Sequence, residues 1–150
     1  MEKAKAKRVL WELSRLVNPE FMLPDIFSQL DDSNTHHFTS LVFGPADTPY
    51  ADGAFIFDVV VPPEYPFKSP SVQLLTTDGG TVRFNPNLYN CGKVCLSILG
   101  TWSGPGWSPV LNFNTVLLSI QSLLTASPYL NEPGKTPDPP NEAAYSARVR

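Results

Sequence analysis

The first segment of the chain has apolar residues at the spacing of an amphipathic helix. Its apolar stripe within residues 2–17 consists of Val9, Leu10, Leu13, Leu16 and Val17. The basic residues are expected on the solvent side, and they are Lys3, Lys5, Lys7, Arg8 and Arg15. The pattern predicts a helix over 2–17 that stops at Asn18, because a residue before proline is pushed out of the α region.

Short segments rich in β-branched and aromatic residues follow at hairpin spacing. They are residues 25–30, 37–43, 54–61 and 71–77. The connections between them carry the Asp, Asn, Gly and Pro residues that turns require. Consecutive strands with short connections pair antiparallel, so the sequence predicts a four-stranded antiparallel meander.

Helical spacing returns over residues 112–125, where Asn112 or Asn114 would cap the start. The broad apolar face of this segment is Phe113, Val116, Leu117, Ile120 and Leu124, which predicts a central helix that covers the sheet. Residues 141–150 begin like a short C-terminal helix. The order of elements predicts an α+β fold with helices on one side of the sheet, in a single domain over residues 1–150.

Composition excludes several classes of function. The net charge of -3 offers no basic field for nucleic acid, and no apolar run reaches the roughly 18 residues that a membrane span needs. The N-terminus has no apolar stretch behind its charges, so no secretory signal is expected. We therefore expect a cytoplasmic or nuclear protein that binds neither membrane nor nucleic acid.

The two cysteines, Cys91 and Cys95, raise the question of chemistry. Two cysteines make no disulfide framework, and their spacing differs from the C-x-x-C of zinc and redox sites, so no metal is expected. A cysteine hydrolase would need an imidazole beside the thiol, and the only histidines are His36 and His37, which we interpret as ordinary hairpin residues. From the residues alone, Cys95 is either a nucleophile or a small buried side chain.

The surroundings of Cys95 resemble the ubiquitin-conjugating enzyme family. Asn85-Pro86-Asn87 precedes Cys95 by eight positions counted from Asn87, as the His-Pro-Asn tripeptide of that family precedes its catalytic cysteine. The other matching motifs are Gly44-Pro45, Thr48-Pro49-Tyr50, Gly53, Tyr65-Pro66-Phe67, Pro70, Trp107-Ser108-Pro109 and residues 116–120. The resemblance covers about residues 1–133 and implies the ubiquitin-conjugating fold, with an active-site loop before the central helix.

Three further stretches resemble the Z-type branch of this family, which includes the catalytic domains of very large ubiquitin-conjugating proteins. They are residues 83–89, 100–102 and 128–134. Asn85 replaces the family histidine, and the resemblance implies that this position supports the loop. The chain also has extra residues before Trp107, and its C-terminal helices are expected to be shortened or truncated.

The resemblance implies a transferase with a thioester intermediate. Cys95, presented as an accessible sulfur, would accept ubiquitin or a ubiquitin-like modifier from an activating enzyme and pass it to a substrate lysine or a ligase. Asn87 would donate to the oxyanion or hold the loop that shields it, and Asn131 and Glu132 would help the attacking lysine lose its proton. Cys91 is expected to be a bystander.

The resemblance also implies partners. Phe67, Pro109 and Val110 match the loops that meet ligases, although core packing of Phe67 stays open. Lys7 and Arg8, with Lys3, match the surface of the first helix that meets the activating enzyme and ligase. No cofactor is expected, since the activating enzyme would use the ATP, and the protein is expected to be a monomer. The alternative hypothesis is a catalytically silent adaptor with the same fold that binds ubiquitin or a ligase.

Overall fold

The computed structural model describes residues 2–131, 141, 143–144 and 146–147. Its elements, in chain order, are helix α1 (Glu2–Val17), strands β1 (Ile26–Leu30), β2 (His37–Phe43), β3 (Ala54–Val60) and β4 (Ser71–Leu74), the 3₁₀ helix η1 (Ser97–Leu99), helix α2 (Phe113–Gln121) and the 3₁₀ helix η2 (Pro128–Asn131). The predicted order of helix, four strands, loop and helix is confirmed.

The strands form one antiparallel sheet in the order β1-β2-β3-β4, so the predicted meander is confirmed. The last strand is shorter than the expected 71–77 and ends at Leu74. Leu74 pairs with Phe57 of β3, its N also donates to Gly92 O at 2.8 Å, and Gln73 bridges to Lys93. The segment that leads to Cys95 is thus attached to the edge of the sheet at β4.

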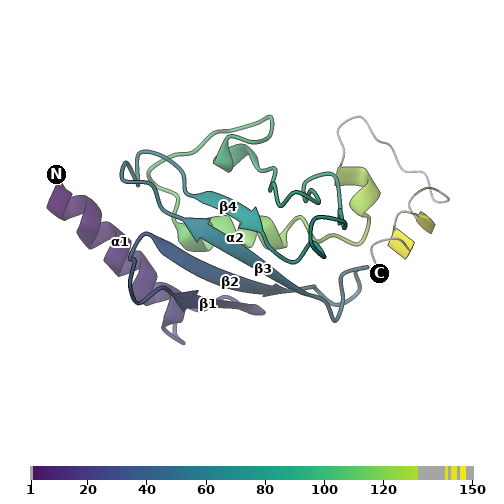
Figure 1. Cartoon of the computed structure of the whole chain (residues 1–150), viewed down its shortest axis with the longest axis horizontal. Helices are drawn as coiled ribbons and strands as arrows, with labels where there is room; N and C mark the ends of the chain where they lie inside the picture. The colour runs from purple at the N-terminus through teal and green to yellow at the C-terminus, as the bar shows by residue number, and fades with distance from the viewer. Residues whose placement is uncertain (1, 132–140, 142, 145, 148–150) are drawn as a thin grey trace.

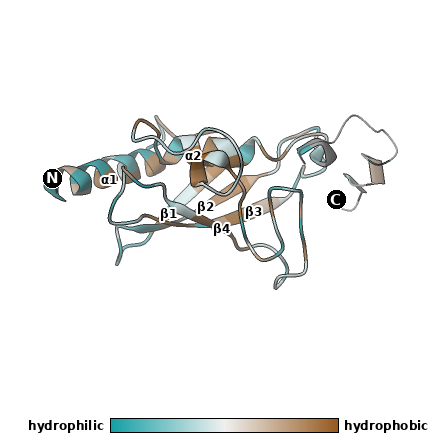
Figure 2. Cartoon of the chain, turned by 90° about the horizontal axis from the view of Figure 1, so that it is seen from above, coloured by the Kyte–Doolittle hydropathy of each residue, from teal (hydrophilic) through white to brown (hydrophobic). Residues whose placement is uncertain are grey.

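Helix α2 lies across one face of the sheet, with α1 along the edge next to β1 (Figure 1, Figure 2). The core forms where α2 meets the inward residues of the strands, and its largest members include Phe38, Phe57, Phe113, Leu117 and Ile120. Asn112, one of the two predicted caps, accepts a hydrogen bond from Thr115 N at 2.9 Å. The helix ends at Gln121 rather than at the expected 125.

The buried face of α1 differs from the predicted stripe. Val9, Leu13 and Leu16 are buried, but Leu10 is 54% exposed and Glu12 occupies a core position. The buried residues follow the spacing i, i+3, i+4, i+7 from Val9, and Leu10 falls outside this narrow arc. Arg8 also departs from the prediction, because it lies half-buried rather than free on the solvent side.

The C-terminal region is described only in part. The backbone is helical at residues 141, 143–144 and 146–147, which agrees with the expected short helix at those positions. Among the residues that the structure describes, no helix has the length and apolar character needed to cross a membrane.

Candidate active site

The candidate active site is built from two loop segments that lie against each other between β4 and α2. Cys95 N donates to Asn87 O at 2.8 Å, and Asn87 Nδ2 donates to Cys95 O at 2.8 Å. These two bonds fix the tripeptide directly against the backbone of the cysteine. The spacing of eight positions in the sequence therefore corresponds to a contact in the structure.

Asn87 holds the loop in this geometry. Its residue is only 4% exposed, and its Nδ2 is used by the carbonyl of Cys95. Its Oδ1 is buried and has no hydrogen-bond partner among the described residues. A buried acceptor without a partner costs about 1–3 kcal/mol. Of the two roles implied for Asn87, the loop-holding role is the one that this geometry displays.

Asn85 holds Asn87 in place through hydrogen bonds of its own side chain. Its Oδ1 accepts a hydrogen bond from Asn87 N at 2.8 Å, and its Nδ2 donates to Tyr50 Oη at 2.9 Å and to Leu123 O at 3.2 Å. Asn85 is fully buried, so these bonds satisfy a side chain that would otherwise be costly to bury. The geometry agrees with the expectation that this position supports the loop.

The expectation of an accessible sulfur at Cys95 is wrong for this structure. Cys95 is 1% exposed and begins the turn into η1. The turn is tightly bonded, because Thr101 Oγ1 accepts from Leu96 N at 3.0 Å and donates to Val94 O at 2.7 Å. Gly104 lies so close to η1 that a Cβ on it would stand 3.1 Å from Ser97 Cβ. Gly104, in the stretch with extra residues before Trp107, therefore lies against η1.

Burial also sets the protonation of the thiol. It raises the pKa of Cys95, while Lys93 and Arg83 act in the opposite direction. A thiol with a raised pKa carries little thiolate near neutral pH, so Cys95 is mainly a protonated thiol in this conformation. Cys91 is exposed, and both cysteines are free thiols.

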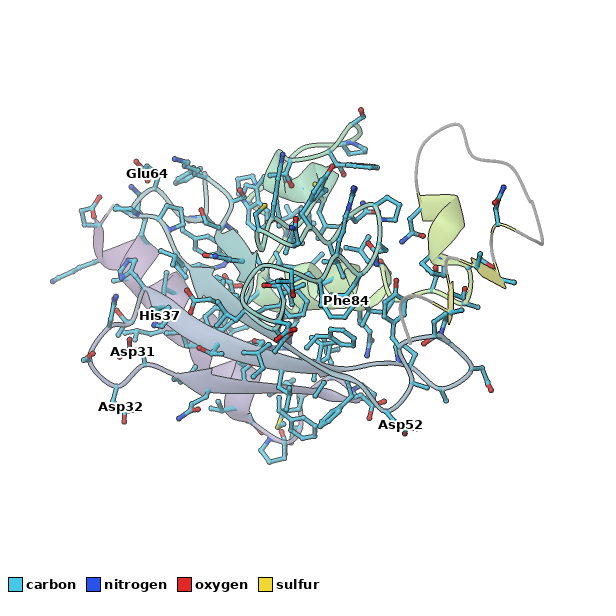
Figure 3. The ribbon with its side chains drawn as sticks, turned by 45° about the vertical axis from the view of Figure 1, so that its right-hand side comes forward. Asp31, Asp32, His37, Asp52, Glu64 and Phe84 are labelled. Carbon is cyan, nitrogen blue, oxygen red and sulfur yellow. The ribbon has the colours of Figure 1, made fainter. Side chains whose placement is uncertain are left out.

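No histidine is placed to activate Cys95. His37 Nδ1 bonds Asp31 Oδ2 at 2.8 Å, and its Nε2 bonds Asp58 Oδ1. Figure 3 shows His37 and Asp31 together near one end of the sheet, well apart from Phe84, which immediately precedes Asn85. His36 contacts its neighbour Thr35. The interpretation of the two histidines as hairpin residues agrees with this placement.

The far end of the site contains Asn131. Its Nδ2 donates to Leu123 O at 3.0 Å, the carbonyl that also accepts from Asn85. Its Oδ1 accepts from Thr125 Oγ1 at 3.3 Å. The structure thus brings Asn131 to the same backbone carbonyl as the tripeptide, while Glu132 lies outside the described residues.

The predicted ligase loops lie side by side. Phe67 is 63% exposed and Val110 is 83% exposed, and Pro109 is exposed as well. Trp107 Nε1 donates to Pro66 O at 2.7 Å and joins the two loops. Phe67 is therefore a surface residue, and the alternative of core packing is excluded.

A family model described as ubiquitin-conjugating enzyme matches residues 11–146. The chain belongs to the ubiquitin-conjugating enzyme family. It is 54% identical over 114 residues to "Ubiquitin-conjugating enzyme E2 Z" of Homo sapiens, which covers 76% of this chain and 30% of that protein. It is 49% identical over 138 residues to human "Dual E2 ubiquitin-conjugating enzyme/E3 ubiquitin-protein ligase BIRC6", covering 87% of this chain and 3% of that protein.

A solved structure gives the same result for the fold. A ubiquitin-conjugating enzyme E2 domain from Toxoplasma gondii aligns with a TM-score of 0.68 and 30% identity, over 95% of this chain and 83% of that chain. The ubiquitin-conjugating fold and the likeness to the Z-type branch are confirmed. The chain spans about a third of the length of the Z-type relatives, at 36% for the protein of Xenopus tropicalis.

In this conjugating-enzyme fold, Arg8 is part of the framework and is not a free surface cation. Its Nε bonds Glu12 Oε2 at 2.5 Å, and its Nη2 donates to Leu111 O at 2.7 Å in the loop that carries Val110. Arg8 therefore positions that loop, and its contact with the activating enzyme or ligase stays a prediction. Lys7 is exposed, as expected for a surface residue.

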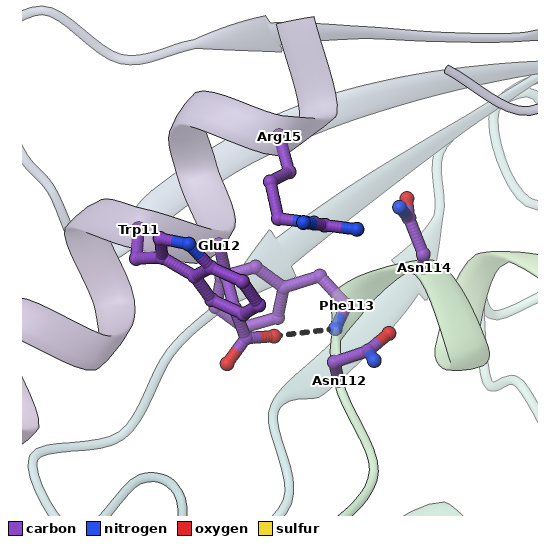
Figure 4. Close-up of a pocket in the computed structure, with 6 residues that line it drawn as sticks. All are labelled: Trp11, Glu12, Arg15, Asn112, Phe113 and Asn114. Atoms are coloured by element: carbon purple, nitrogen blue, oxygen red, sulfur yellow. Dashed lines mark hydrogen bonds between the residues drawn. The ribbon is translucent and has the colours of Figure 1, made fainter. Parts of the chain in front are cut away.

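Glu12 is the residue that the sequence analysis missed. Its carboxylate accepts from Phe113 N at 2.8 Å (Figure 4). It also accepts from Tyr65 Oη at 2.8 and 2.7 Å. Burial and the bond to Glu12 raise the pKa of Tyr65. The sequence did contain a sign of this role, because Glu12 is three positions after Val9 and so lies on the same face of α1 as the buried apolar residues. Glu12 joins α1, the Tyr65 turn and the start of α2.

A shallow pocket beside Glu12 opens between α1 and the start of α2 (Figure 4). Its lining includes Trp11, Arg15 and Asn114. The Arg15 guanidinium carbon stacks 4.7 Å from the Trp11 ring centre and 3.8 Å from that of Phe21. Among the described residues, no group of three or more His, Cys, Asp or Glu side chains could hold a metal ion.

Proposed function

We propose that this chain is the catalytic domain of a ubiquitin-conjugating enzyme, with Cys95 as its acceptor. The observation that carries the proposal is the direct pairing of Asn87 with Cys95 through two backbone-anchored hydrogen bonds of 2.8 Å. In the first step, the Cys95 thiolate attacks the thioester carbonyl that links the modifier's terminal glycine to the activating enzyme. The bond to the activating enzyme's sulfur breaks, and that sulfur leaves as thiolate.

In the second step, a neutral lysine amine attacks the new thioester, its nitrogen loses a proton to solvent or to Glu132, and the Cys95 thiolate leaves. The tetrahedral intermediate carries an oxyanion, which a hydrogen-bond donor would stabilise. Asn87 Nδ2 has a second N–H besides the one that donates to Cys95 O, and this second N–H is the donor proposed to stabilise the oxyanion. Asn131 and Glu132 are the residues proposed to receive or orient the incoming lysine.

The burial of Cys95 supports a protected intermediate. A covered thioester is shielded from hydrolysis, which suits an enzyme that must keep its cargo until a partner arrives. A covered sulfur cannot meet a carbonyl carbon, however, so charging is proposed to require a local movement of the loop that exposes Cys95.

The partners follow from the same comparison. Phe67, Pro109 and Val110 form an exposed apolar patch that suits a small transient interface with a ligase. Lys7 is proposed to contribute to binding of the activating enzyme. The modifier is ubiquitin or a ubiquitin-like protein, ATP is consumed by the activating enzyme, and the domain acts as a monomer in the cytoplasm or nucleus.

The test is thioester formation on a non-reducing gel, with the protein, ubiquitin, ATP and an activating enzyme. A reductant-sensitive adduct should form, disappear in Cys95→Ala and persist in Cys91→Ala. If several activating enzymes and modifiers give no adduct, the proposal fails and the silent adaptor is the remaining hypothesis. An adduct that depends on Cys91 instead would assign the reaction to the wrong cysteine.

A second experiment tests Asn87 after charging. Asn87→Ala should still form the thioester, but transfer to free lysine should slow by about 10²–10³, the usual cost of an oxyanion donor. Asn90→Ala is the matched control, since Asn90 lies in the same loop and its Nδ2 donates only to Gly80 O at 2.9 Å. Unchanged transfer in Asn87→Ala would remove its proposed role.

A further inference from the structure

The charges around the candidate active site are unusual for this chain. The whole protein carries a net charge of -3, yet residues 79–131 contain no Asp or Glu. The only Lys or Arg residues in that stretch are Arg83 and Lys93. Both are exposed, and neither forms a salt bridge within the part of the chain that the structure describes.

These two cations flank one aromatic ring. The Arg83 guanidinium carbon lies 4.1 Å from the centre of the Tyr89 ring, and Lys93 Nζ lies 5.8 Å from it. Tyr89 N donates to Lys93 O at 3.0 Å, which fixes the two residues across the turn that contains Cys91. Arg83, Tyr89 and Lys93 are called the cationic rim below.

The cationic rim is hydrogen-bonded to the backbone of the candidate active site. Arg83 Nε donates to Asn85 O at 3.3 Å, and its Nη2 donates to Pro86 O at 3.2 Å. Arg83 therefore binds the backbone of residues 85–87, the tripeptide whose Asn87 pairs with Cys95. Lys93 stands two positions before Cys95, and both cations lower the pKa of the thiol against the effect of burial, so their field reaches the sulfur.

An incoming lysine meets this field as a like charge. Two cations near the thioester disfavour the ammonium form of that lysine and favour the neutral amine that attacks. They also repel the substrate segment unless it brings its own negative charge. Unpaired cations beside a reaction centre thus favour an acidic segment, because charge complementarity raises the rate of encounter and suppresses wrong partners.

On the basis of the proposed function, we propose that the cationic rim is an acceptor-side subsite that selects lysines flanked by acidic residues. A Glu or Asp next to the acceptor lysine would pair with Lys93 or with the exposed edge of Arg83. Both cations lie near the Tyr89 ring, at 4.1 and 5.8 Å from its centre, so they stand close to each other at the subsite. The rim therefore sets substrate preference and does not take part in bond making.

The test is single-turnover discharge of the preformed ubiquitin thioester. Two peptides are compared, which share one lysine and differ only in whether its neighbours are Glu or Gln, with free lysine as the acceptor without flanks. The wild type should transfer to the Glu peptide about two- to fivefold faster for each exposed pair formed. The preference should fall as salt is added, since exposed charges are screened.

Variants of the rim make the test specific. Lys93→Gln should lose most of the preference, measured as the ratio of the rates for the Glu and Gln peptides, and Lys93→Glu should reverse that ratio; free lysine reports the general effect of each variant on the thioester. Arg83→Lys should retain a preference but slow all acceptors, because a lysine cannot make both bonds to the tripeptide carbonyls. Lys5→Gln, which removes one cation from α1, should leave the preference unchanged.

The outcomes separate this inference from the proposed function. Normal transfer to free lysine with equal rates for the two peptides overturns the rim subsite alone. A preference that survives in Lys93→Gln with Arg83→Gln also overturns it, as does an equal loss for peptide and free lysine in Lys93→Gln. Failure to form any thioester on Cys95 overturns the proposed function, and the subsite falls with it.

Discussion

Two buried polar networks flank α2, and they differ in how completely they are bonded. At the start of the helix, both oxygens of Glu12 have partners on Arg8, Tyr65 and Phe113. Beyond its other end, Asn85 is fully bonded, but the buried Oδ1 of Asn87 has no partner among the described residues. The first network is closed, and the second leaves one acceptor open at the cysteine.

This difference fits the tasks that the two ends would perform. A satisfied buried network is rigid, and here it fixes the loop of Val110 relative to α1 through the bond from Arg8 to Leu111 O. A network with an open acceptor already bears a penalty of about 1–3 kcal/mol, so its rearrangement is less costly. Rigidity suits a docking surface, whereas easier rearrangement suits a site that must expose a thiol.

The largest expected effect comes from breaking the closed network. Glu12→Ala leaves the Arg8 charge and the groups on Tyr65 and Phe113 without a partner, which should lower the free energy of unfolding by about 3–5 kcal/mol. Glu12→Gln keeps the shape and part of the bonding, so it should cost less. Urea denaturation followed by tryptophan fluorescence measures both variants.

Glu20→Ala is the control for this prediction, because Glu20 is exposed beyond the end of α1. Its effect should stay within about 0.5 kcal/mol. If Glu12→Ala were as mild as Glu20→Ala, the two ends of α2 would not differ in the way described, and the closed network would contribute little.

The sequence predicted the elements better than their limits. The bounds of α1 agree with the expectation, because its apolar period and the Asn18-Pro19 stop are local signals. The attachment of β4 to Gly92 and Lys93 could not be predicted, because these residues belong to a separate segment of the chain. Glu12 was missed for a related reason, since only tertiary partners make an acid acceptable at a core position.

The same limit applies to the candidate site. The spacing of Asn87 and Cys95 in the sequence predicted that the two residues lie close together. The hydrogen bond from Asn87 Nδ2 to Cys95 O joins them in the structure. The burial of Cys95 was not predictable, because it depends on tertiary packing around the loop that a local sequence pattern does not record. The sequence likewise did not show that Arg8 is held by Glu12 and Leu111, since a basic residue on a helix is ordinarily solvated.

A smaller effect is expected at the open network. Asn85→Ala removes the support of Asn87 N and the bonds to Tyr50 and Leu123, and it should cost about 2 kcal/mol of stability. Transfer from the charged enzyme should also slow, since Asn87 is no longer held. Asn85→His should recover part of both losses, because an imidazole offers one acceptor and one donor. Equal losses in the two variants would show that the position acts through volume alone.

The cover over Cys95 can be measured by alkylation. Iodoacetamide should modify Cys91 first and Cys95 several-fold more slowly, because Cys95 is buried and burial raises its pKa. The rate at Cys95 should climb with pH above the neutral range, as its thiolate forms. Mass spectrometry of the labelled peptides gives both rates, and labelling in urea is the control. Equal rates in the folded protein would mean that the cover is open in solution.

The smallest effect is expected at a third network, which faces solvent on the sheet. Bonds to Asp58 and Asp31 raise the pKa of His37 above its ordinary value of 6.5. The stabilisation should therefore be complete below about pH 6.5 and be lost as the pH rises through the raised value.

His37→Gln should cost about 0.5 kcal/mol at pH 6 and less at pH 9, since exposed pairs are weak. His36→Gln is the matched control, and urea midpoints at the two pH values measure the difference. A cost for His37→Gln that did not change with pH would mean that its imidazole is held for shape, as a neutral side chain would be.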